Sequence, residues 1–242
     1  MLQKSGAVVL STINYNESSF IATLFTREQG ALPFMVRRPK TSRSSMRTNI
    51  FQPLQLLRIE WNHHEARNFQ SLRTATPACY YRTLHTHPIK TAISLFLAEA
   101  LFHALRNEQT NPDLYDYIDH SIRFLDLCDT SVANFHIIFL LRMAPFLGLR
   151  PNLTPVEGAI CFDMLGSCYA ACLPDHPYYI NGREVELLPT LIRLRFSTMH
   201  LLPLTRLERN RITDLILQYY RLHVPAFGRL HSPDILKQIL DD

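Results

Sequence analysis

The sequence predicts an α+β protein in which a barrel of five short β-strands precedes a mainly α-helical domain with a small irregular insertion. Three observations support this prediction. Runs of β-branched and aromatic residues, separated by turn residues, fill the chain from Gly6 to Thr76. From Pro88 onward, apolar residues recur at intervals of three and four. The charge is also uneven, because residues 1–73 contain ten Lys or Arg against four Glu, a net charge of +6, while the rest carries −2.

The candidate strands follow one another at about the 8–12-residue spacing of a small antiparallel barrel or sandwich. The exception is the long stretch from Pro39 to Phe51, between the third and fourth strands. A five-stranded barrel with one long connection is the outline of an OB-fold, which commonly binds oligonucleotides. We expect the strands at 6–12, 19–26, 31–38, 53–61 and 67–76.

Helix signals begin after Pro77. They comprise proline at a first helical turn, residues that cap a helix start, and a glycine that ends a helix. We therefore place the domain boundary near residue 78, with a barrel domain at 1–78 and a helical domain at 79–242. The signals are Pro88, Asn111-Pro112, Ser131 with the stop at Gly148, the capping box Thr205 and Glu208, and Ser232-Pro233.

The stretch 152–188 interrupts the helical pattern. Two alternating pieces flank residues 165–167, which predicts a hairpin inserted in the helical domain. The stretch also holds the best metal candidates. Structural zinc sites usually contain cysteine pairs separated by two to four residues, roughly, so the six-residue first interval argues against zinc. We expect thiols in a hairpin core, no metal and no cofactor, with zinc as the alternative for Cys161, Cys168, Cys172 and His176.

Other sequence features exclude several classes of protein. The apolar run from Gly6 to Leu10 is too short for a signal-peptide core, and the run from Ile137 to Leu141 falls far short of the ~20 residues of a membrane span. We therefore expect a cytoplasmic protein that does not enter a membrane. The chain lacks the nucleotide phosphate loop, the dinucleotide-binding glycine turn and the nucleophile elbow, so we expect no enzyme.

The basic segment 37–47 is the most specific feature. It carries five cations separated by small hydroxyl residues, and no acid occurs between Glu28 and Glu60. Arginine presents paired donors to phosphate oxygens, and the hydroxyl groups add further donors. The segment predicts contact with the DNA backbone, whereas a solvated loop without a partner is the alternative. Its cations are Arg37, Arg38, Lys40, Arg43 and Arg47.

Aromatic residues near this segment are candidates for stacking on exposed bases. Phe34 lies inside a predicted strand and Phe51 next to one, where core packing is the commoner role. Tyr15 and Trp61 lie at strand ends. We therefore include Tyr15 and Trp61 among the DNA-binding residues.

Several short motifs resemble the RecO family of bacterial DNA repair proteins. They are spread over nearly the whole chain, and each is weak alone but fairly specific in combination. The motifs are Gly6-x-Val8-Val9-Leu10, Tyr15-x-Glu17-Ser18-Ser19-x-Ile21, Phe25-Thr26-x-Glu28-x-Gly30, Phe51-Gln52-Pro53-Leu54, Phe146-Leu147-Gly148-Leu149-x-Pro151, Tyr219-Tyr220-x-x-His223 and Ser232-x-x-Ile235-Leu236.

The resemblance implies a mediator of the RecF recombination pathway. Such proteins bind single- and double-stranded DNA, anneal complementary strands, and work with RecR to load RecA onto DNA coated by single-strand-binding protein (SSB). The acidic, Phe-ended C-terminal tail of SSB is then expected to bind the helical domain, where Arg142 and Arg150 are candidate contacts. Many family members carry four zinc-binding cysteines after the Gly-Leu-x-Pro motif, but residues 151–155 contain none.

Two other classes of function stay open. The first is a protein-interaction scaffold, whose barrel would bind a partner protein and no DNA. The second is a zinc-dependent hydrolase, whose metal ligands would be the cysteines and histidine of the insertion.

Overall fold

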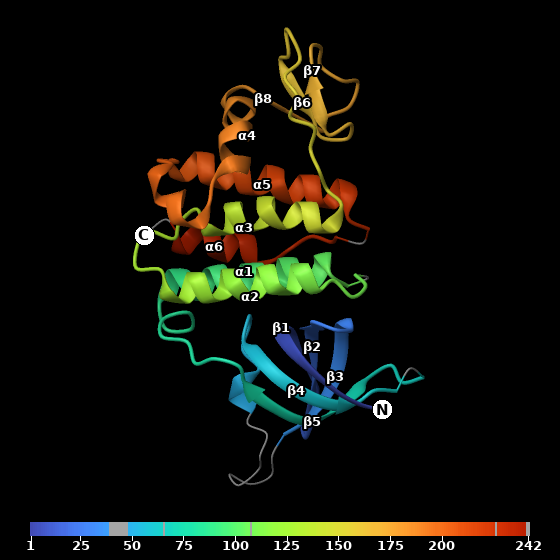
Figure 1. Ribbon diagram of the computed structural model, residues 1–242. Coiled ribbons are helices and arrows are strands. Elements are labelled where there is room, and N and C mark those ends of the chain that lie inside the picture. Colours follow the sequence, from blue (N-terminus) through green and yellow to red (C-terminus); the bar gives the residue numbers. More distant parts are fainter. Residues whose placement is uncertain (39–47, 65, 107, 226, 241–242) are drawn as a thin grey trace. The chain divides into compact units, whose positions relative to one another are not determined.

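Five strands close into a barrel in the computed structural model of the chain (Figure 1). Neighbouring strands follow the order β1-β2-β3-β5-β4, with β3 and β5 parallel and the other pairs antiparallel. The predicted OB-fold barrel is confirmed. Its strands are β1 (Leu2–Asn16), β2 (Ser19–Thr26), β3 (Gly30–Arg37), β4 (Leu56–Asn62) and β5 (Gln70–Pro77).

β1 is longer than the strand predicted at 6–12 because it serves two partners. Residues 2–8 pair with β4, and residues 7–16 pair with β2. The pairing register shifts between Val9 and Ser11. Such an irregularity bends a strand and increases its twist, which lets one strand lie along two sides of a small barrel.

β4 begins three residues later than the predicted strand. Leu54 has a φ of 59°, in the left-handed region, so the chain turns there before it enters the sheet. The side chain of Leu54 is fully buried. The Tyr81 hydroxyl stabilises this turn, since it donates to the Leu54 carbonyl at 2.8 Å and accepts from the Leu56 N–H at 3.1 Å.

The barrel core is built from the inward-facing side chains of the strands. The Phe34 and Trp61 rings meet edge to face, with centroids 5.6 Å apart, and Phe20 meets Phe51 in the same way at 5.3 Å. Such pairs add specific contacts to the burial of apolar area. The buried cluster contains Ala7, Val9, Phe20, Ala22, Leu24, Phe34, Val36, Phe51, Leu57, Ile59, Trp61 and Ala75.

The structure describes residues 1–38, 48–64, 66–106, 108–225 and 227–240. Their contacts divide the chain into two units, each with a core of its own. The first unit comprises Met1–Leu127 with Leu230–Leu236, and the second comprises Cys128–Arg229 with Lys237–Asp242.

The first unit includes two helices besides the barrel, whereas the sequence suggests a division near residue 78. They are α1 (Pro88–Ala104) and α2 (Pro112–Leu127). Arg27 forms a two-pronged pair with Asp116 of α2, with both N–O distances 2.9 Å. The Arg27 guanidinium lowers the pKa of the Asp116 carboxyl, because it donates hydrogen bonds to the ionised form. Contacts of this kind join α2 to the barrel within one unit.

The connection between β5 and α1 is fixed by a buried carboxylate. Asp126 of α2 accepts backbone N–H bonds from Arg82, Thr83 and Leu84 at 2.8–3.0 Å. Burial opposes its ionisation, but these donors hold the pKa of Asp126 below its ordinary value. The ammonium group of Lys90 donates to the Asp126 carbonyl at 2.9 Å. The start of α1 therefore lies beside the end of α2, and the two helices run antiparallel (Figure 1).

The second unit combines helices with a small sheet. The predicted helix ending at Gly148 is observed as an α-helix followed by a 3-10 turn, and Gly148 has the positive φ of 76° that favours glycine after a helix end. The predicted hairpin is a three-stranded sheet of order β7-β6-β8. The elements are α3 (Phe135–Met143), η2 (Ala144–Leu147), β6 (Cys161–Asp163), β7 (Cys168–Ala170), β8 (Tyr179–Asn181), α4 (Arg183–Arg193), η3 (Phe196–Leu201) and α5 (Arg206–His223).

The last two helices in chain order are α5 and α6. α5 begins with the predicted capping box, in which Thr205 and Glu208 exchange hydrogen bonds. The last helix, α6 (Ser232–Ile239), starts in the first unit, where Glu99 of α1 accepts the backbone N–H and the hydroxyl of Ser232. None of the helices that the structure describes is long and apolar enough to cross a membrane.

The small sheet is fastened to α5 by its first turn. Ser167 has a φ of 53°, and its hydroxyl oxygen lies 2.8 Å from the hydroxyl oxygen of Tyr219. The Nε2 atom of His223 lies 2.7 Å from the Met164 carbonyl oxygen. Tyr219 and His223 of the Tyr-Tyr-x-x-His motif thus hold the loop between β6 and β7.

Candidate nucleic-acid interface and apolar pocket

The basic segment starts at the end of β3, where the barrel presents two exposed arginines. Arg37 is the last residue of β3, and Arg38 follows it. The backbone N–H of Arg38 donates to the Ser18 carbonyl at 2.7 Å, and its guanidinium donates to Asn14 Oδ1 at 2.6 Å. The guanidinium carbon also lies 5.6 Å from the centre of the Phe20 ring, a cation–π contact. Arg38 is therefore held in place before any ligand arrives.

The other three cations of the segment, Lys40, Arg43 and Arg47, lie outside the described residues. Their assignment to DNA binding stays a prediction from the sequence. On the described part of the barrel, Arg58, Arg67 and Arg73 are also exposed.

A polar pocket lies beside Arg38. Its volume is about 240 Å³, and the residues that line it come from β1, from β2 and from both sides of the basic segment. We call it the Arg38 pocket. The described residues that line it offer hydroxyl, amide and guanidinium groups over two phenylalanine rings, and none of them is a carboxylate. The lining residues are Thr12, Asn14, Phe20, Arg38, Thr48, Asn49 and Phe51.

The two predicted stacking residues differ in exposure. Tyr15, near the end of β1, is 57% exposed, and its ring centre lies 6.4 Å from that of Phe69. Trp61 is fully buried in the barrel core against Phe34, and its indole N–H points to His63 Nδ1 at 3.4 Å. A buried ring has no face to offer a base, so Trp61 is removed from the candidate stacking residues. Its position near a strand end misled the sequence interpretation, because the inward side of β4 includes residue 61.

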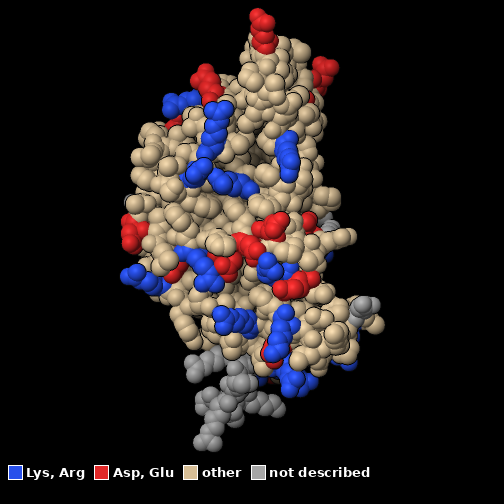
Figure 2. All heavy atoms as spheres, viewed as in Figure 1, with Lys and Arg blue, Asp and Glu red and all other residues tan. Residues whose placement is uncertain are grey.

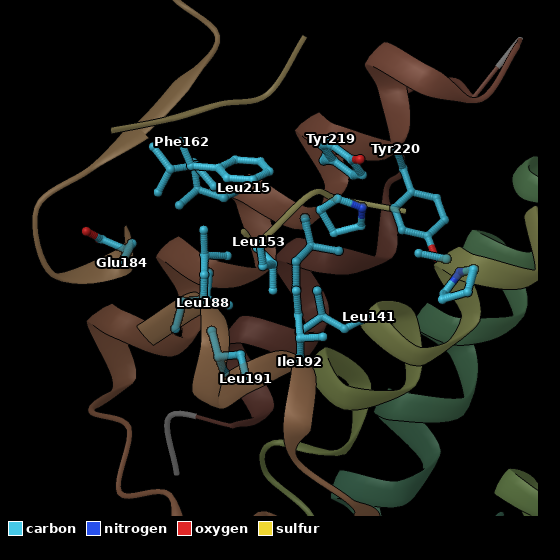
Figure 3. Close-up of a pocket in the computed structure, with 16 residues that line it drawn as sticks. Leu141, Leu153, Phe162, Glu184, Leu188, Leu191, Ile192, Leu215, Tyr219 and Tyr220 are labelled. Atoms are coloured by element: carbon cyan, nitrogen blue, oxygen red, sulfur yellow. The ribbon is translucent and has the colours of Figure 1, made fainter. Parts of the chain in front are cut away.

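The second unit contains an apolar pocket, drawn in Figure 3. Its volume is about 90 Å³, and its walls come from α3, α4, α5 and the small sheet. Glu184 alone is charged among the described residues of the lining. The lining residues are Leu141, Ala144, Pro145, Pro151, Leu153, Phe162, Ile180, Glu184, Leu188, Leu191, Ile192, Ile212, Leu215, Ile216, Tyr219 and Tyr220.

Two ion pairs join α4 to α5 near this pocket. Arg183 Nε lies 2.8 Å from Glu208 Oε1, and Arg211 Nε lies 3.9 Å from Glu184 Oε1. Figure 2 shows Lys and Arg side chains gathered over α4 and α5. Both arginines are about two-thirds exposed, so solvent screens each pair and it adds little to stability. Their charge remains accessible to an anionic partner.

The candidate partner contacts Arg142 and Arg150 adjoin the apolar pocket in the sequence. Arg142 follows the lining residue Leu141, and Arg150 precedes the lining residue Pro151. Both arginines are exposed. Arg142 donates to the Leu194 carbonyl at 3.2 Å, which holds its guanidinium at the end of α3. Sequence reasoning did not find the pocket itself, because its lining comes from four segments far apart in the chain.

Two of the four candidate zinc ligands of the insertion, Cys161 and His176, contact other groups of the protein. The Cys161 thiol is buried and lies 3.4 Å from the Cys172 carbonyl oxygen, and burial raises its pKa. His176 Nε2 faces Asp163 Oδ1 at 3.3 Å. Over the residues that the structure covers, His, Cys, Asp and Glu side chains form no group of three that could hold a metal ion.

Two family models together match most of the chain. The family described as Recombination protein O N terminal matches residues 1–81, and the one described as Recombination protein O C terminal matches residues 85–233. The chain belongs to the RecO family. This membership agrees with the barrel and helical domain described above, and it assigns the chain to DNA repair and recombination.

Three RecO relatives match along essentially their whole length, and each is named DNA repair protein RecO. The relative from Phocaeicola vulgatus is 41% identical over 239 residues, 99% of each chain. The relative from Bacteroides fragilis is 38% identical over 242 residues, and that from Porphyromonas gingivalis is 33% identical over 247 residues, in both cases 100% of each chain.

Proposed function

We propose that this RecO-family chain is a recombination mediator that binds single- and double-stranded DNA through its barrel and catalyses no reaction. The observation that carries the proposal is the exposed pair Arg37 and Arg38, which opens a segment of five cations on a closed OB-fold barrel. A cationic surface that contacts phosphates binds strands of any sequence. Such a protein can hold two complementary strands close together, which favours annealing.

A serine and a histidine lie close together beside Tyr219 of the apolar pocket, but their geometry does not suit a nucleophile and its base. Ser167 Oγ lies 3.4 Å from His223 Nε2, within reach of a nucleophile and its base. However, the same nitrogen lies 2.7 Å from the Met164 carbonyl oxygen, so it carries a proton that it donates there. A protonated nitrogen cannot accept the hydroxyl proton, so this pair does not activate Ser167.

We further propose that the protein acts together with RecR, RecA and SSB, and its membership of the RecO family supports this. For the SSB tail, we propose the apolar pocket as the site of the terminal phenylalanine. The pocket is lined by aliphatic and aromatic side chains, Arg142 and Arg150 are next to lining residues in the sequence, and Arg211 Nε lies 3.9 Å from Oε1 of the lining residue Glu184. An apolar cavity beside cations suits a peptide that ends in a phenylalanine and carries acidic residues. Because DNA and proteins that act on DNA are its proposed partners, we place the protein in the cytoplasm.

The decisive experiment compares two variants with equal charge change. In the first, Arg37, Arg38, Lys40, Arg43 and Arg47 are replaced by Gln. In the control, five exposed arginines of the second unit are replaced in the same way. We expect the first variant to lose most of its affinity for a labelled oligonucleotide and the control to bind like the unmodified protein. The control positions are Arg193, Arg195, Arg206, Arg221 and Arg229.

Equal binding by the first variant and the unmodified protein would remove the basic segment from the interface. If the unmodified protein binds no oligonucleotide even at low salt but still forms a complex with another repair protein, the scaffold function replaces the mediator function. A strand-annealing assay with and without SSB tests the proposed action on SSB-coated DNA, because annealing of coated strands requires both DNA binding and recognition of SSB.

A further inference from the structure

The Arg38 pocket has the composition of an anion site. Among the lining residues that the structure describes, the polar groups are two hydroxyls, two side-chain amides and one guanidinium, without a carboxylate. Hydroxyls, amides and guanidinium groups all donate hydrogen bonds, and the guanidinium adds a permanent positive charge. A carboxylate in the lining would repel an anion, so its absence from this set matters.

The hydrogen bond between Arg38 and Asn14 determines which atoms a ligand meets. Asn14 Oδ1 accepts from Arg38 Nη2 at 2.6 Å. The oxygen is therefore engaged, and the amide nitrogen, a donor, is the end that Asn14 can offer to a ligand. Arg38 has five N–H donors, of which this bond uses one. The pair thus presents donors to a ligand in the pocket.

The floor of the pocket does not suit a stacked base. Phe20 and Phe51 pack edge to face in the barrel core, and each is only 5% exposed. The Arg38 guanidinium lies over the Phe20 ring. Stacking needs an open ring face, and neither ring offers one. The ligand that fits is therefore a small, negatively charged acceptor.

The position of the pocket links it to the basic segment. Arg38 lies before residues 39–47, and Thr48 and Asn49 follow them, so the residues on both sides of this stretch line the pocket. We propose that the Arg38 pocket binds one phosphate group of a DNA strand, with Arg38, Asn14, Thr48 and Asn49 as donors. The proposal rests on DNA binding by the barrel, and it adds a defined anchor point that is indifferent to base sequence.

The test is Asn49→Asp, which places a negative charge in the pocket with almost no change of shape. We expect it to weaken binding of single-stranded oligothymidylate by about tenfold to a hundredfold, the effect of one hydrogen bond to a charged group. The matched control is Asn62→Asp, which adds the same charge at an exposed position of β4. The control is expected to bind within about twofold of the unmodified protein, since a lone exposed charge is screened by salt.

A second oligonucleotide distinguishes a phosphate from a base. In an abasic strand of equal length, each base is absent but every phosphate remains. We expect Asn49→Asp to weaken binding of the abasic and oligothymidylate strands by the same factor. A loss seen with oligothymidylate alone would show that the pocket reads a base, and this would overturn the proposal.

The remaining outcomes separate the pocket from the proposed function. If Asn49→Asp and Asn62→Asp bind equally well, the pocket holds no phosphate while DNA binding by the barrel stands. If the unmodified protein fails to bind either strand at low salt, both proposals fall. Thermal unfolding of the two variants, expected to match the unmodified protein, shows that any loss arises at the pocket.

Discussion

The hydroxyl group of Tyr115 lies directly over Gly6, so near that a Cβ atom added at position 6 would be 2.5 Å from the hydroxyl oxygen. Gly6 belongs to β1, and Tyr115 belongs to α2. The Tyr115 ring is almost completely buried, and its centre lies 6.2 Å from that of Phe25. The glycine of the first family motif is thus explained by close packing of a helix on the barrel.

Gly6→Ala should therefore destabilise the first unit. The methyl group forces the buried Tyr115 ring to move, and overpacking of this kind costs about 1–3 kcal/mol. Urea unfolding measures the change in free energy. In a Tyr115→Phe background the cost should be smaller, because the atom nearest to the added methyl group is gone. An equal cost in both backgrounds would contradict the assignment of the clash to the hydroxyl.

Trp61 offers a direct check of the barrel core, because it is the only tryptophan in the chain. Its ring is fully buried, so its fluorescence should be blue-shifted and should not change when a saturating oligonucleotide is added. Tryptophans that stack on bases are quenched. Quenching on addition of DNA would mean that Trp61 reaches the strand, contrary to its place in the structure.

For Tyr15 we expect the opposite behaviour, because this side chain is accessible to a DNA strand. More than half of its surface is exposed near the end of β1, so Tyr15→Ala should leave the free energy of unfolding nearly unchanged. If the ring stacks on a base, single-stranded DNA binding should weaken by about 1–3 kcal/mol. Titration of a labelled oligonucleotide gives this value. Unchanged affinity would remove Tyr15 from the DNA interface.

His136 makes the stability of the second unit depend on pH. Thr213 Oγ1 donates to the Arg209 carbonyl at 2.8 Å and lies 3.0 Å from His136 Nε2, so it accepts a hydrogen bond from the neutral ring. Burial lowers the pKa of His136 from 6.5 to about 3. Between these values the unfolded chain binds the extra proton and the folded chain does not. Stability is therefore complete above about pH 6.5 and falls as the pH is lowered toward 3.

The expected loss from this group is about 2 kcal/mol between neutral pH and pH 5. Urea unfolding at the two pH values measures it. In His136→Leu the difference between the two pH values should shrink by about that amount, although the variant loses the Thr213 hydrogen bond at both. A pH dependence identical to that of the unmodified protein would show that His136 is not the group responsible.

The strands and helix ends were predictable because their signals are local. The capping box at Thr205 and Glu208 and the helix stop at Gly148 appear where the sequence places them. α4 was not predicted, because Pro189 lies inside it. A proline in the interior of a helical pattern normally indicates a break, since it removes a backbone donor and clashes with the preceding turn.

The candidate site was only partly predictable for a different reason. The cations of the basic segment are consecutive in the chain, so composition alone reveals them. Asn14, Thr48 and Asn49 are ordinary polar residues that only the closed barrel brings beside Arg38. Whether residue 61 faces inward depends on the register of β4 with β1 and β5, which no local pattern states.

The salt dependence of DNA binding reports how many phosphates the basic segment contacts. If all five cations of the basic segment engage phosphates of a single strand, the logarithm of the binding constant should fall with the logarithm of salt concentration at a slope of about −3.5. The variant with all five cations replaced by Gln should show a slope near zero and little remaining affinity. A slope that is the same in the variant and the unmodified protein would contradict DNA binding through this segment.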